Sequence, residues 1–589
     1  MMFLPLVFHA KEVHIVHVGD MHGWIYGQKT KPDLGDLGTL LSYYERVVAN
    51  VSQNPEASVL LIGSGDDCEG TGLSGLTEPK CSEIYRFLSK VPFDMMTVGN
   101  HDLSQPASME FLRSFQGNFS KNALVTTNTY YVADNSSFGL PYKYQILQNG
   151  IRVLMISLMY TGDNNYGNTR VQPQTELLES TWFNDLIKEF GPKTDLFLYN
   201  THQGVVMPET RSTYQKLRKL FSQHLNYEVP MHVMCGHTHM VFRTNCPLRN
   251  GAKDENCFMT ESGKYLERVE HVVWTLEETQ VQIPDGELFT GAKVANVTHF
   301  DYDFMVPEQN ERGEGLAKRF NINPEQFMTE NGKMLSKQIH DKLDELNITQ
   351  VIGFSKHKYH KTHGMGQNDS LQRLWNFGVM PALVFDDKMQ QECTQFPITR
   401  AALSKDHLYQ GNVTLDDTVI AVPFSFNISY LPHLTKNEAE CVAFWSNLGL
   451  WNIGENAISK ETFQKLYDKR NRNPKPLPKH NLFYTYVNNT WERDCYDIIT
   501  NEYEAPRLMM GYKFCNMTGP EEKRYPVKSG IQLTDALFTE YVRKYMKNET
   551  EIDSIDDKNL SSAYFNVGIA TAVAWSLGIV LIAFFVFRK

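Results

Sequence analysis

The sequence lacks a basic stripe. Its 589 residues carry 68 Asp and Glu against 57 Lys and Arg, which gives a formal net charge of −11. With no basic face to offset this charge, we do not expect a nucleic acid duplex as a partner. The local basic run at 355–363 is interpreted as a solvated loop. Internal repeats and low-complexity tracts are also lacking, and the composition is that of a globular protein too long for one core.

Long uncharged apolar runs are almost absent, and the exception lies at the end of the chain. Residues 567–587 contain no charged side chain and could cross about 30 Å of hydrocarbon as a helix. Arg588 and Lys589 follow, as is typical of a cytoplasmic flank. A lipid-anchor signal would normally end in its apolar tail, which makes that alternative the weaker one. The sequence predicts a stalk at 546–564, a single-pass type I transmembrane helix at 565–587 and a cytoplasmic tail at 588–589.

The other end also bears on the compartment. Residues 1–10 are apolar and end in the small residue Ala10, as in a short signal peptide, although they lack a basic start and the usual length. Twelve N-x-[ST] sequons are spread over the chain before the apolar run, and none follows it. We therefore predict an extracellular or lumenal body, at the cell surface or in a vacuole-like or lysosome-like compartment.

Cysteine is scarce, with nine residues in the chain. In an oxidising compartment they would form disulfides and leave at least one thiol free. Sequence proximity favours the pairs Cys246–Cys257 and Cys495–Cys515, although connectivity cannot be deduced from spacing. Cys235 lies in an apolar run and is predicted to be buried and free.

Five polar motifs stand out because each follows an apolar run that is typical of a buried strand. The carboxyl ends of such strands carry the sites of open α/β sheets. The motifs are GDMHG (Asp20, His22), GSGDDCEG (Asp66), VGNHD (Asn100, His101), YNTH (His202) and GHTH (His237, His239).

The donors in these motifs are Asp, His and Asn, which suit two hard or borderline divalent ions. A carboxylate that bridges two ions would complete a two-metal hydrolase site, so the motifs predict phosphoester hydrolysis. Cys68 lies among them, but no second cysteine does. We interpret it as a loop thiol or a half-cystine, with Cys81 as a candidate partner, rather than as a ligand. The alternative for the whole set is a degenerate, non-catalytic copy.

The first part of the chain alternates strand-like and helical patterns, which predicts a layered α/β domain over 11–275. Helices are expected at 37–53 and 81–91, and strands at 263–278 would close the domain.

A linker is expected at 276–349, with a bridging helix at 323–346 that Asn323–Pro324 could start. A second mixed domain is expected over 350–545. Its strand-like runs are PALVFDD (381–387), TVIAVPF (418–424) and DCYDIITNEY (494–503).

The five motifs resemble those of the calcineurin-like metallophosphoesterases, and more closely those of the membrane-anchored, two-domain ecto-5′-nucleotidase family. The resemblance is detailed over 11–275 and traceable to about residue 515. It implies an α/β fold: a four-layer β-sandwich flanked by helices, a bridging helix and a second mixed α/β domain that binds the substrate.

The resemblance also implies roles for the motif residues. Two divalent ions would be bound, with zinc expected and manganese, iron or magnesium compatible with the donors. The first ion would be held by Asp20, His22 and His239, the second by Asn100, His202 and His237, with Asp66 bridging. His101 would be the catalytic imidazole that stabilises the phosphoryl group or protonates the leaving oxygen. Asn128 matches a loop asparagine that lies near the phosphate in the family.

The third motif departs from the family, which usually reads GNHEFD and uses the last Asp to orient the catalytic histidine. This chain reads GNHDLS, with Ser104 at that position and Asp102 next to His101. Either Asp102 or another carboxylate orients the ring, or His101 works without such a partner.

The resemblance implies a nucleoside site in the second domain. Arg400, in QFPITR, is in register with a family arginine, and Phe424 and Tyr512 fall where two aromatic rings would enclose the base. Core packing is the alternative role for both rings, since aromatic residues in strand-like runs are commonly buried.

These observations predict a dimetal phosphohydrolase, and in particular a 5′-nucleotidase that acts on nucleoside 5′-monophosphates outside the cytosol. One alternative keeps the metal site but takes a phosphodiester, a nucleoside diphosphate or another small phosphoester. Another is a non-catalytic surface protein that keeps the fold. The expected partners are a small phosphoester and the membrane, and a homodimer is left open.

Overall fold

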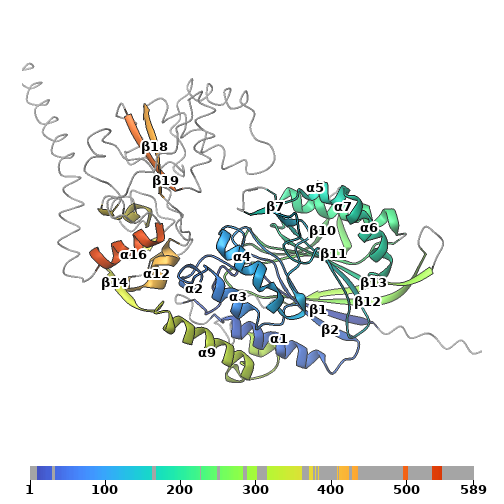
Figure 1. Ribbon diagram of the computed structural model, residues 1–589. Coiled ribbons are helices and arrows are strands. Elements are labelled where there is room, and N and C mark those ends of the chain that lie inside the picture. The colour runs from blue at the N-terminus through green and yellow to red at the C-terminus, as the bar shows by residue number, and fades with distance from the viewer. Residues whose placement is uncertain are drawn as a thin grey trace, which may run out of the picture. The chain divides into compact units, whose positions relative to one another are not determined.

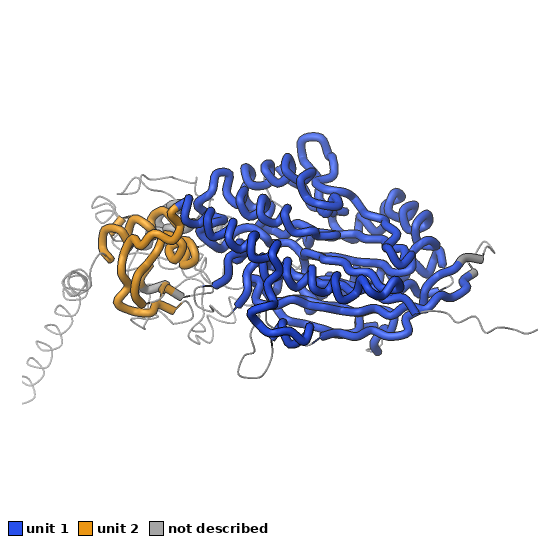
Figure 2. The backbone as a smooth tube through the Cα atoms, turned by 90° about the horizontal axis from the view of Figure 1, so that it is seen from below, with its two compact units in different colours: residues 1–346 blue, residues 347–589 orange. Residues whose placement is uncertain are grey.

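The protein is described here by a computed structural model in which two compact units are distinguished, residues 1–346 and 347–589 (Figure 2). The structure describes residues 10–28, 34–161, 168–225, 227–248, 252–282, 288–300, 315–360, 371–375, 379, 382–383, 407–408, 410–422, 428–435, 495–501 and 534–546.

The first unit is built on two mixed sheets (Figure 1). The five-stranded sheet has the order β13 (Leu288–His299), β12 (Glu270–Gln282), β1 (Lys11–Val18), β2 (Ala57–Gly63) and β3 (Met95–Met96). The six-stranded sheet has the order β10 (Val241–Pro247), β11 (Lys253–Ser262), β9 (Met231–Cys235), β8 (Leu196–His202), β6 (Arg152–Met159) and β5 (Lys143–Ile146). A further pair of short strands is β4 (Thr129–Tyr131) and β7 (Thr169–Val171). The parallel pairs are β1–β2, β2–β3, β6–β8, β8–β9 and β9–β11, so their carboxyl ends share one edge in each sheet.

The two sheets face each other across an apolar core. Ile15 of β1 and Trp274 of β12 come from one sheet, and Met155 of β6, Leu198 of β8 and Met234 of β9 come from the other. All five side chains are fully shielded from solvent. Their alternation with outward-facing apolar residues explains why the strands read as nearly continuous hydrophobic runs.

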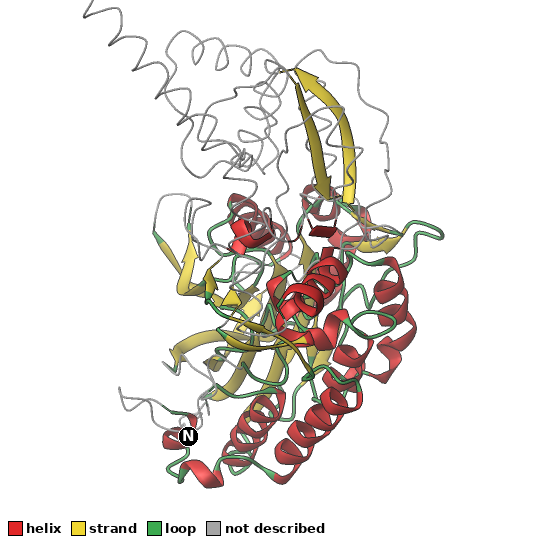
Figure 3. Cartoon of the chain, turned by 90° about the vertical axis from the view of Figure 1, so that its left-hand side faces the viewer, coloured by secondary structure: helices red, strands yellow, loops and turns green. Residues whose placement is uncertain are grey.

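Helices cover the outer faces of the sheets (Figure 3). On one side, α5 (Gln174–Glu179), α6 (Thr181–Phe190) and α7 (Pro208–His224) pack on the six-stranded sheet. On the other, α1 (Leu37–Val51) contacts β2 and α9 (Glu330–Glu345) packs on α1. The remaining helices of four residues or more are α2 (Gly72–Gly75), α3 (Ser82–Leu88), α4 (Pro106–Phe115) and α8 (Leu316–Arg319). This layered α/β sandwich is the fold class that the sequence predicted.

The boundaries of the first unit differ from the expected ones. The predicted domain end at 275 falls inside β12, which pairs with β13 in the same sheet. The helix expected at 323–346 begins later, because the side chain of Thr329 caps it by accepting a hydrogen bond from the amide of Gly332. A Cβ on Gly38 of α1 would lie 2.3 Å from the carbonyl oxygen of Gly332, so the two helices cross in close contact. The helix therefore belongs to the first unit.

The second unit is described in part. Its elements are β14 (Val351–Ser355), β15 (Tyr359–His360), α10 (Leu371–Leu374), β16 (His407–Leu408), β17 (Gly411–Thr414), α12 (Leu415–Ala421), β18 (Ile428–Thr435), β19 (Cys495–Asn501) and α16 (Thr534–Tyr545). Strands β14 and β17 pair, and α16 and α12 contribute to an apolar cluster that includes Trp375, Val413 and Phe538.

The strand predicted at 418–424 is wrong, because its first residues lie in α12. Thr414 caps this helix by accepting from the amide of Asp417, while the carboxylate of Asp417 accepts from the amide and hydroxyl of Thr414. This reciprocal capping outweighs the strand propensity of the β-branched run. The strand expected at 494–503 is confirmed as β19, whereas 382–383, in the first predicted run, are helical.

Two disulfides are described, Cys68–Cys81 and Cys246–Cys257, and Cys235 is buried and free, as predicted. The partner proposed for Cys495 lies outside the described residues. Within the ranges given above, no helix is long and apolar enough to cross a membrane. The predicted signal peptide, except Ala10, and the predicted span at 565–587 lie outside those ranges.

Candidate metal centre

The five motifs meet where five parallel strands end. Asp20 and His22 follow β1, Asp66 follows β2, Asn100 and His101 follow β3, His202 closes β8, and His237 and His239 follow β9. The side chains form three overlapping groups whose candidate ligand atoms lie within 4.8 Å of one another: Asp20, His22 and His239; His22, Asp66 and His101; and Asp66, His202 and His237.

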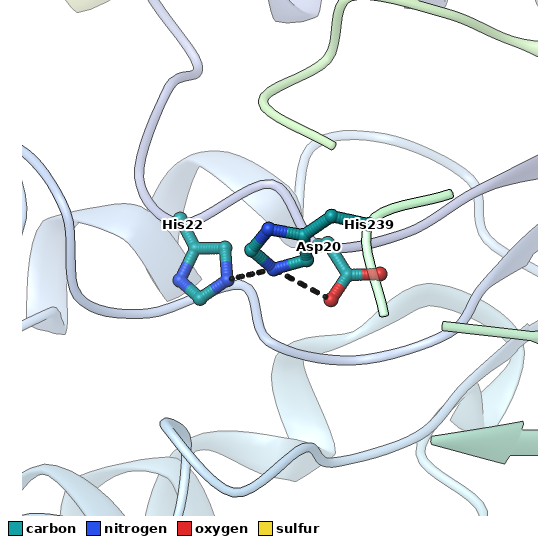
Figure 4. Close-up of side chains that lie close together, drawn as sticks. All are labelled: Asp20, His22 and His239. Atoms are coloured by element: carbon teal, nitrogen blue, oxygen red, sulfur yellow. Dashed lines mark hydrogen bonds and ion pairs between the residues drawn. The ribbon is translucent and has the colours of Figure 1, made fainter. Parts of the chain in front are cut away.

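The first group contains the residues predicted for the first ion (Figure 4). His239 Nε2 lies 3.3 Å from Asp20 Oδ1 and 3.1 Å from His22 Nε2. The other nitrogen of His22, Nδ1, lies 2.8 Å from the carbonyl oxygen of Glu69. A carbonyl can only accept, so Nδ1 carries the proton and Nε2 keeps its lone pair toward the group.

The group of Asp66, His202 and His237 contains the predicted bridge and two of the residues predicted for the second ion, and Asn100 lies beside His237. Asp66 Oδ2 lies 3.0 Å from His202 Nε2, yet this nitrogen has no partner with hydrogen-bond geometry among the described residues. His202 Nδ1 donates to the carbonyl oxygen of Ser64 at 2.8 Å, so Nε2 is the nitrogen that could bind an ion once it has lost its proton. The amide oxygen of Asn100 lies 3.1 Å from His237 Nδ1. The Asn100–His237 contact has hydrogen-bond geometry, whereas Asp66 Oδ2 and His202 Nε2 are close but not aligned, as fits a common ion between them.

The electrostatics also fit a cation. Asp20 and Asp66 are 0% and 1% exposed, so both carboxylates lie away from water. Burial raises the pKa of Asp20 well above its usual range. Burial opposes ionisation of Asp66 too, but the neighbouring His202 and His101 hold its pKa well below the usual value. Buried carboxylates of this kind need a compensating charge, which divalent ions would supply.

Backbone strain is concentrated at the same residues. Asp20, His22, Asp66, His237 and His239 have φ angles of 51°, 49°, 53°, 75° and 59°. Such left-handed conformations cost free energy for residues with a Cβ and commonly mark functional sites.

Two glycines let the motifs approach each other. A Cβ on Gly65 would lie 2.6 Å from the amide nitrogen of Gly99, and a Cβ on Gly99 would lie 2.1 Å from Asp66 Oδ1. The loops after β2 and β3 can therefore touch only because neither residue carries a side chain.

His101 has a carboxylate partner that the sequence did not reveal. Its Nδ1 lies 2.7 Å from Oε2 of Glu69, and Ser104 Oγ donates to the other carboxylate oxygen at 2.6 Å. Burial favours the neutral ring, but the charges of Asp66 and Glu69 outweigh it and raise the pKa of His101 to about 9. The available sequence signal was a third acidic residue in the second motif, three positions after Asp66.

Asp102, predicted to act with His101, has a different role in the structure. It is 1% exposed, and its carboxylate accepts from the amides of Asp66, Cys68 and Gly99 and from the Tyr85 hydroxyl at 2.8–3.1 Å. Asp102 therefore anchors the loop that carries Asp66 and does not orient the imidazole.

Asn128, predicted near the phosphate, is fully buried. Its amide group donates to the carbonyl oxygens of Met159 and Gln172 and accepts from the amide of Met159. These bonds join the loop before β4 to the end of β6, so the side chain holds backbone together rather than facing the motif residues. The predicted nucleoside-site residues Arg400, Phe424 and Tyr512 lie outside the described residues.

The geometry of the site agrees with the protein family that the sequence matches. Residues 13–241 match the family described as calcineurin-like phosphoesterase. These residues form a calcineurin-like phosphoesterase domain. The domain ranges from β1 to the start of β10 and contains all five motifs. Enzymes of this class are metal-dependent phosphoesterases, in agreement with the donor set.

Longer similarities extend beyond the phosphoesterase domain. An uncharacterized protein from Schizosaccharomyces pombe is 25% identical over 447 residues, which cover 73% of this chain and 71% of the relative. A 5′-nucleotidase from Vibrio parahaemolyticus is 20% identical over 429 residues, 71% of each chain. The crystal structure of a 5′-nucleotidase from Candida albicans matches with a TM-score of 0.70 at 21% identity, over 91% of this chain and 99% of that chain. At this identity the structural likeness shows the fold.

Proposed function

We propose that the protein is a dimetal phosphohydrolase that hydrolyses nucleoside 5′-monophosphates to nucleoside and phosphate outside the cytosol. The observation that carries the proposal is the convergence of the motif residues into overlapping groups with candidate ligand atoms within 4.8 Å. The similarity to 5′-nucleotidases supports the nucleotide as substrate.

In the proposed mechanism, Asp20, His22 and His239 would hold one ion, Asn100, His202 and His237 would hold the other, and Asp66 would contribute to both. When bound, the two ions would neutralise the phosphate and lower the pKa of a water molecule. Zinc is the expected metal, and manganese, iron and magnesium are compatible with these donors.

His101 acts on the leaving side. The attacking water loses one proton to solvent; as its oxygen bonds to phosphorus and the bond from phosphorus to O5′ breaks, His101 Nε2 gives its proton to O5′. The alkoxide charge is thereby removed as it develops, and the imidazole is reprotonated from water after the products leave.

The purified full-length protein tests the activity on a panel of AMP, ADP, p-nitrophenyl phosphate and bis(p-nitrophenyl) phosphate, with and without a chelator. We expect chelator-sensitive release of phosphate from AMP. Hydrolysis of the diester or of ADP but not of AMP would favour the alternative substrates. A protein inactive on every ester would be the non-catalytic surface protein.

The metal assignment is tested with Asn100→Ala, compared with His340→Ala on the exposed face of α9. Loss of an amide ligand should lower the bound metal from two ions toward one and reduce kcat/KM by about 10²-fold or more. Full activity in the Asn100 variant would contradict the assignment.

We further propose an extracellular or lumenal, membrane-anchored body. Sequon asparagines lie exposed on both units, at Asn50, Asn118, Asn135, Asn296, Asn347 and Asn412. Two disulfides also fit an oxidising compartment. A mobility shift after glycosidase treatment tests the location. The homodimer stays a prediction, testable by light scattering.

A further inference from the structure

Glu69 contacts His101 and His22 with different atoms. Its carboxylate is bonded to His101 Nδ1 at 2.7 Å, and its backbone carbonyl accepts from His22 Nδ1 at 2.8 Å. The residue can do both because it adopts a left-handed conformation with φ 62°. One residue thus fixes the ring of a candidate ligand and the ring of the candidate acid.

The carboxylate of Glu69 is itself held in place. It is part of a residue that is 8% exposed, and its second oxygen accepts from Ser104 Oγ at 2.6 Å. Ser104 occupies the position at which the resembling family carries its orienting Asp. The serine hydroxyl positions the glutamate instead of the imidazole.

The backbone on both sides of Glu69 is also tied down. Cys68 is in a disulfide with Cys81, and its amide donates to Asp102 at 3.1 Å. The amide of Gly70 donates to Ser74 Oγ at 3.2 Å. A side chain on so constrained a segment has little freedom to leave the imidazole, which is the preorganisation that a positioning group needs.

We propose that Glu69 is the positioning residue for His101, and that Ser104 completes this arrangement by fixing the glutamate carboxylate. With Nδ1–H donated to Glu69, the ring turns Nε2 toward Asp66, whose Oδ2 lies 4.0 Å away. The proton that reaches the leaving oxygen then comes from the nitrogen that faces the metal residues. This inference rests on the proposed function, because it assigns the acid of that reaction.

The test compares Glu69→Gln with a matched control, Glu110→Gln, an exposed glutamate on α4. The amide keeps the length and the backbone of Glu69 but removes the charge. We expect kcat on AMP to fall about 10- to 100-fold with KM and metal content unchanged. The loss on p-nitrophenyl phosphate should be under about threefold, because a p-nitrophenolate leaves without protonation. The control should match the wild type.

A second variant separates positioning from simple damage. In Glu69→Gln/Ser104→Asp, a carboxylate returns at the family position. We expect the kcat of this double variant on AMP to be at least about tenfold higher than that of Glu69→Gln. Equal losses on AMP and on p-nitrophenyl phosphate, or no recovery in the double variant, would overturn the proposal.

A readout independent of turnover keeps the two hypotheses distinguishable. In protein labelled with [¹⁵N]histidine, the Nδ1–H signal assigned through His101→Asn should shift in Glu69→Gln and stay in Glu110→Gln. If the wild type hydrolyses no phosphoester, the proposed function fails, while an unchanged His101 signal in Glu69→Gln is what would refute the Glu69 contact.

Discussion

Asp102 is a buried carboxylate that stabilises the loop of the site and has no role in the proposed reaction. It satisfies the amides of Asp66, Cys68 and Gly99, three donors that would otherwise be buried without partners. Losing an acceptor that serves several buried donors is costly, because each unpaired amide keeps its desolvation penalty.

We therefore expect Asp102→Ala to lower the free energy of unfolding by about 2–4 kcal/mol, measured by urea denaturation. Tyr85→Phe removes only the hydroxyl that donates to the same carboxylate and should cost about 1 kcal/mol. A neutral Asp102→Ala variant would show that these amides find other partners.

The sequence could predict that the candidate metal residues lie together, because each follows an apolar run directly. The roles of Glu69, Asp102 and Asn128 could not, since they depend on which backbone groups the fold brings within reach. Asp102 is adjacent to His101 in sequence, yet its side chain turns toward the loop after β2. Glu69 is 32 residues away and reaches the ring.

At the scale of elements, polar side chains connect the facing sheets. His17 of β1 lies 2.6 Å from Ser64 Oγ and 3.2 Å from Thr260 Oγ1 of β11, and Thr260 Oγ1 lies 3.1 Å from His232 Nε2 of β9. Trp274 of β12 donates to the other nitrogen of His232. All five side chains are buried, so the two imidazoles are neutral links between the sheets.

This network makes stability depend on pH. Burial lowers the pKa of both His17 and His232 to about 3, against 6.5 for the ordinary side chain. Below pH 6.5 the unfolded chain binds protons that the folded chain refuses, so stability is lost as pH falls from 6.5 toward 3. Each histidine contributes up to about 1.4 kcal/mol per pH unit. The free energy of unfolding, measured by urea denaturation of metal-free protein at several pH values, should show this slope. His232→Gln should lower the slope by up to about 1.4 kcal/mol per pH unit. An unaltered slope would exclude His232 as a source.

The two disulfides offer a comparison between a loop at the site and one away from it. Cys68–Cys81 closes the segment that contains Glu69, with a sequence separation of 13, and Cys246–Cys257 joins β10 and β11 with a separation of 11. Loops of similar length predict similar stabilisation, about 3 kcal/mol.

Replacing either pair by alanines should therefore lower the urea midpoint by a similar amount. Activity on AMP should fall only in the Cys68→Ala/Cys81→Ala variant, because that loop contains Glu69 and begins two residues after Asp66. Equal activity in the two variants, measured well below both unfolding transitions, would contradict a role of that disulfide in the site.

The sequence pattern predicted strands well where burial determines the spacing of apolar residues. It predicted elements less well where a local capping interaction determines that a helix starts. Strands β1, β2, β8 and β9 lie where the apolar runs placed them. Residues 263–269, expected in a strand, instead form a turn in which Tyr265 and Leu266 have φ angles of 57° and 54°. The helix α12 replaced an expected strand because a local capping box, and not its apolar content, sets its start.

At the scale of the whole molecule, the centre lies in one unit and the predicted nucleoside residues lie in the other. The family resemblance placed Arg400, Phe424 and Tyr512 by alignment of short motifs, and their side chains are outside the described residues. Substrate choice therefore rests on the substrate panel, whereas the reaction class rests on the first unit.

Membrane attachment makes a prediction for the full chain. If residues 565–587 span the bilayer, the protein should stay in the membrane pellet after extraction at alkaline pH, since a span buries about 20 apolar residues. A chain ending at residue 564 should move to the soluble fraction with its activity intact. Release of the full-length protein by alkali would reject the span.

The contact among Glu69, Ser104 and His101 has a consequence for how this branch of phosphoesterases can diverge. One carboxylate bonded to His101 Nδ1 is enough to orient the ring, so an acid at position 69 and an acid at position 104 would be alternative solutions. Among homologous sequences, the two positions should covary: an acid at one should accompany a small polar residue at the other. A lineage that moves the acid from one position to the other would pass through an ancestral sequence with neither acid or with both. The first would have a low turnover rate, and the second would place two carboxylates near the same ring nitrogen.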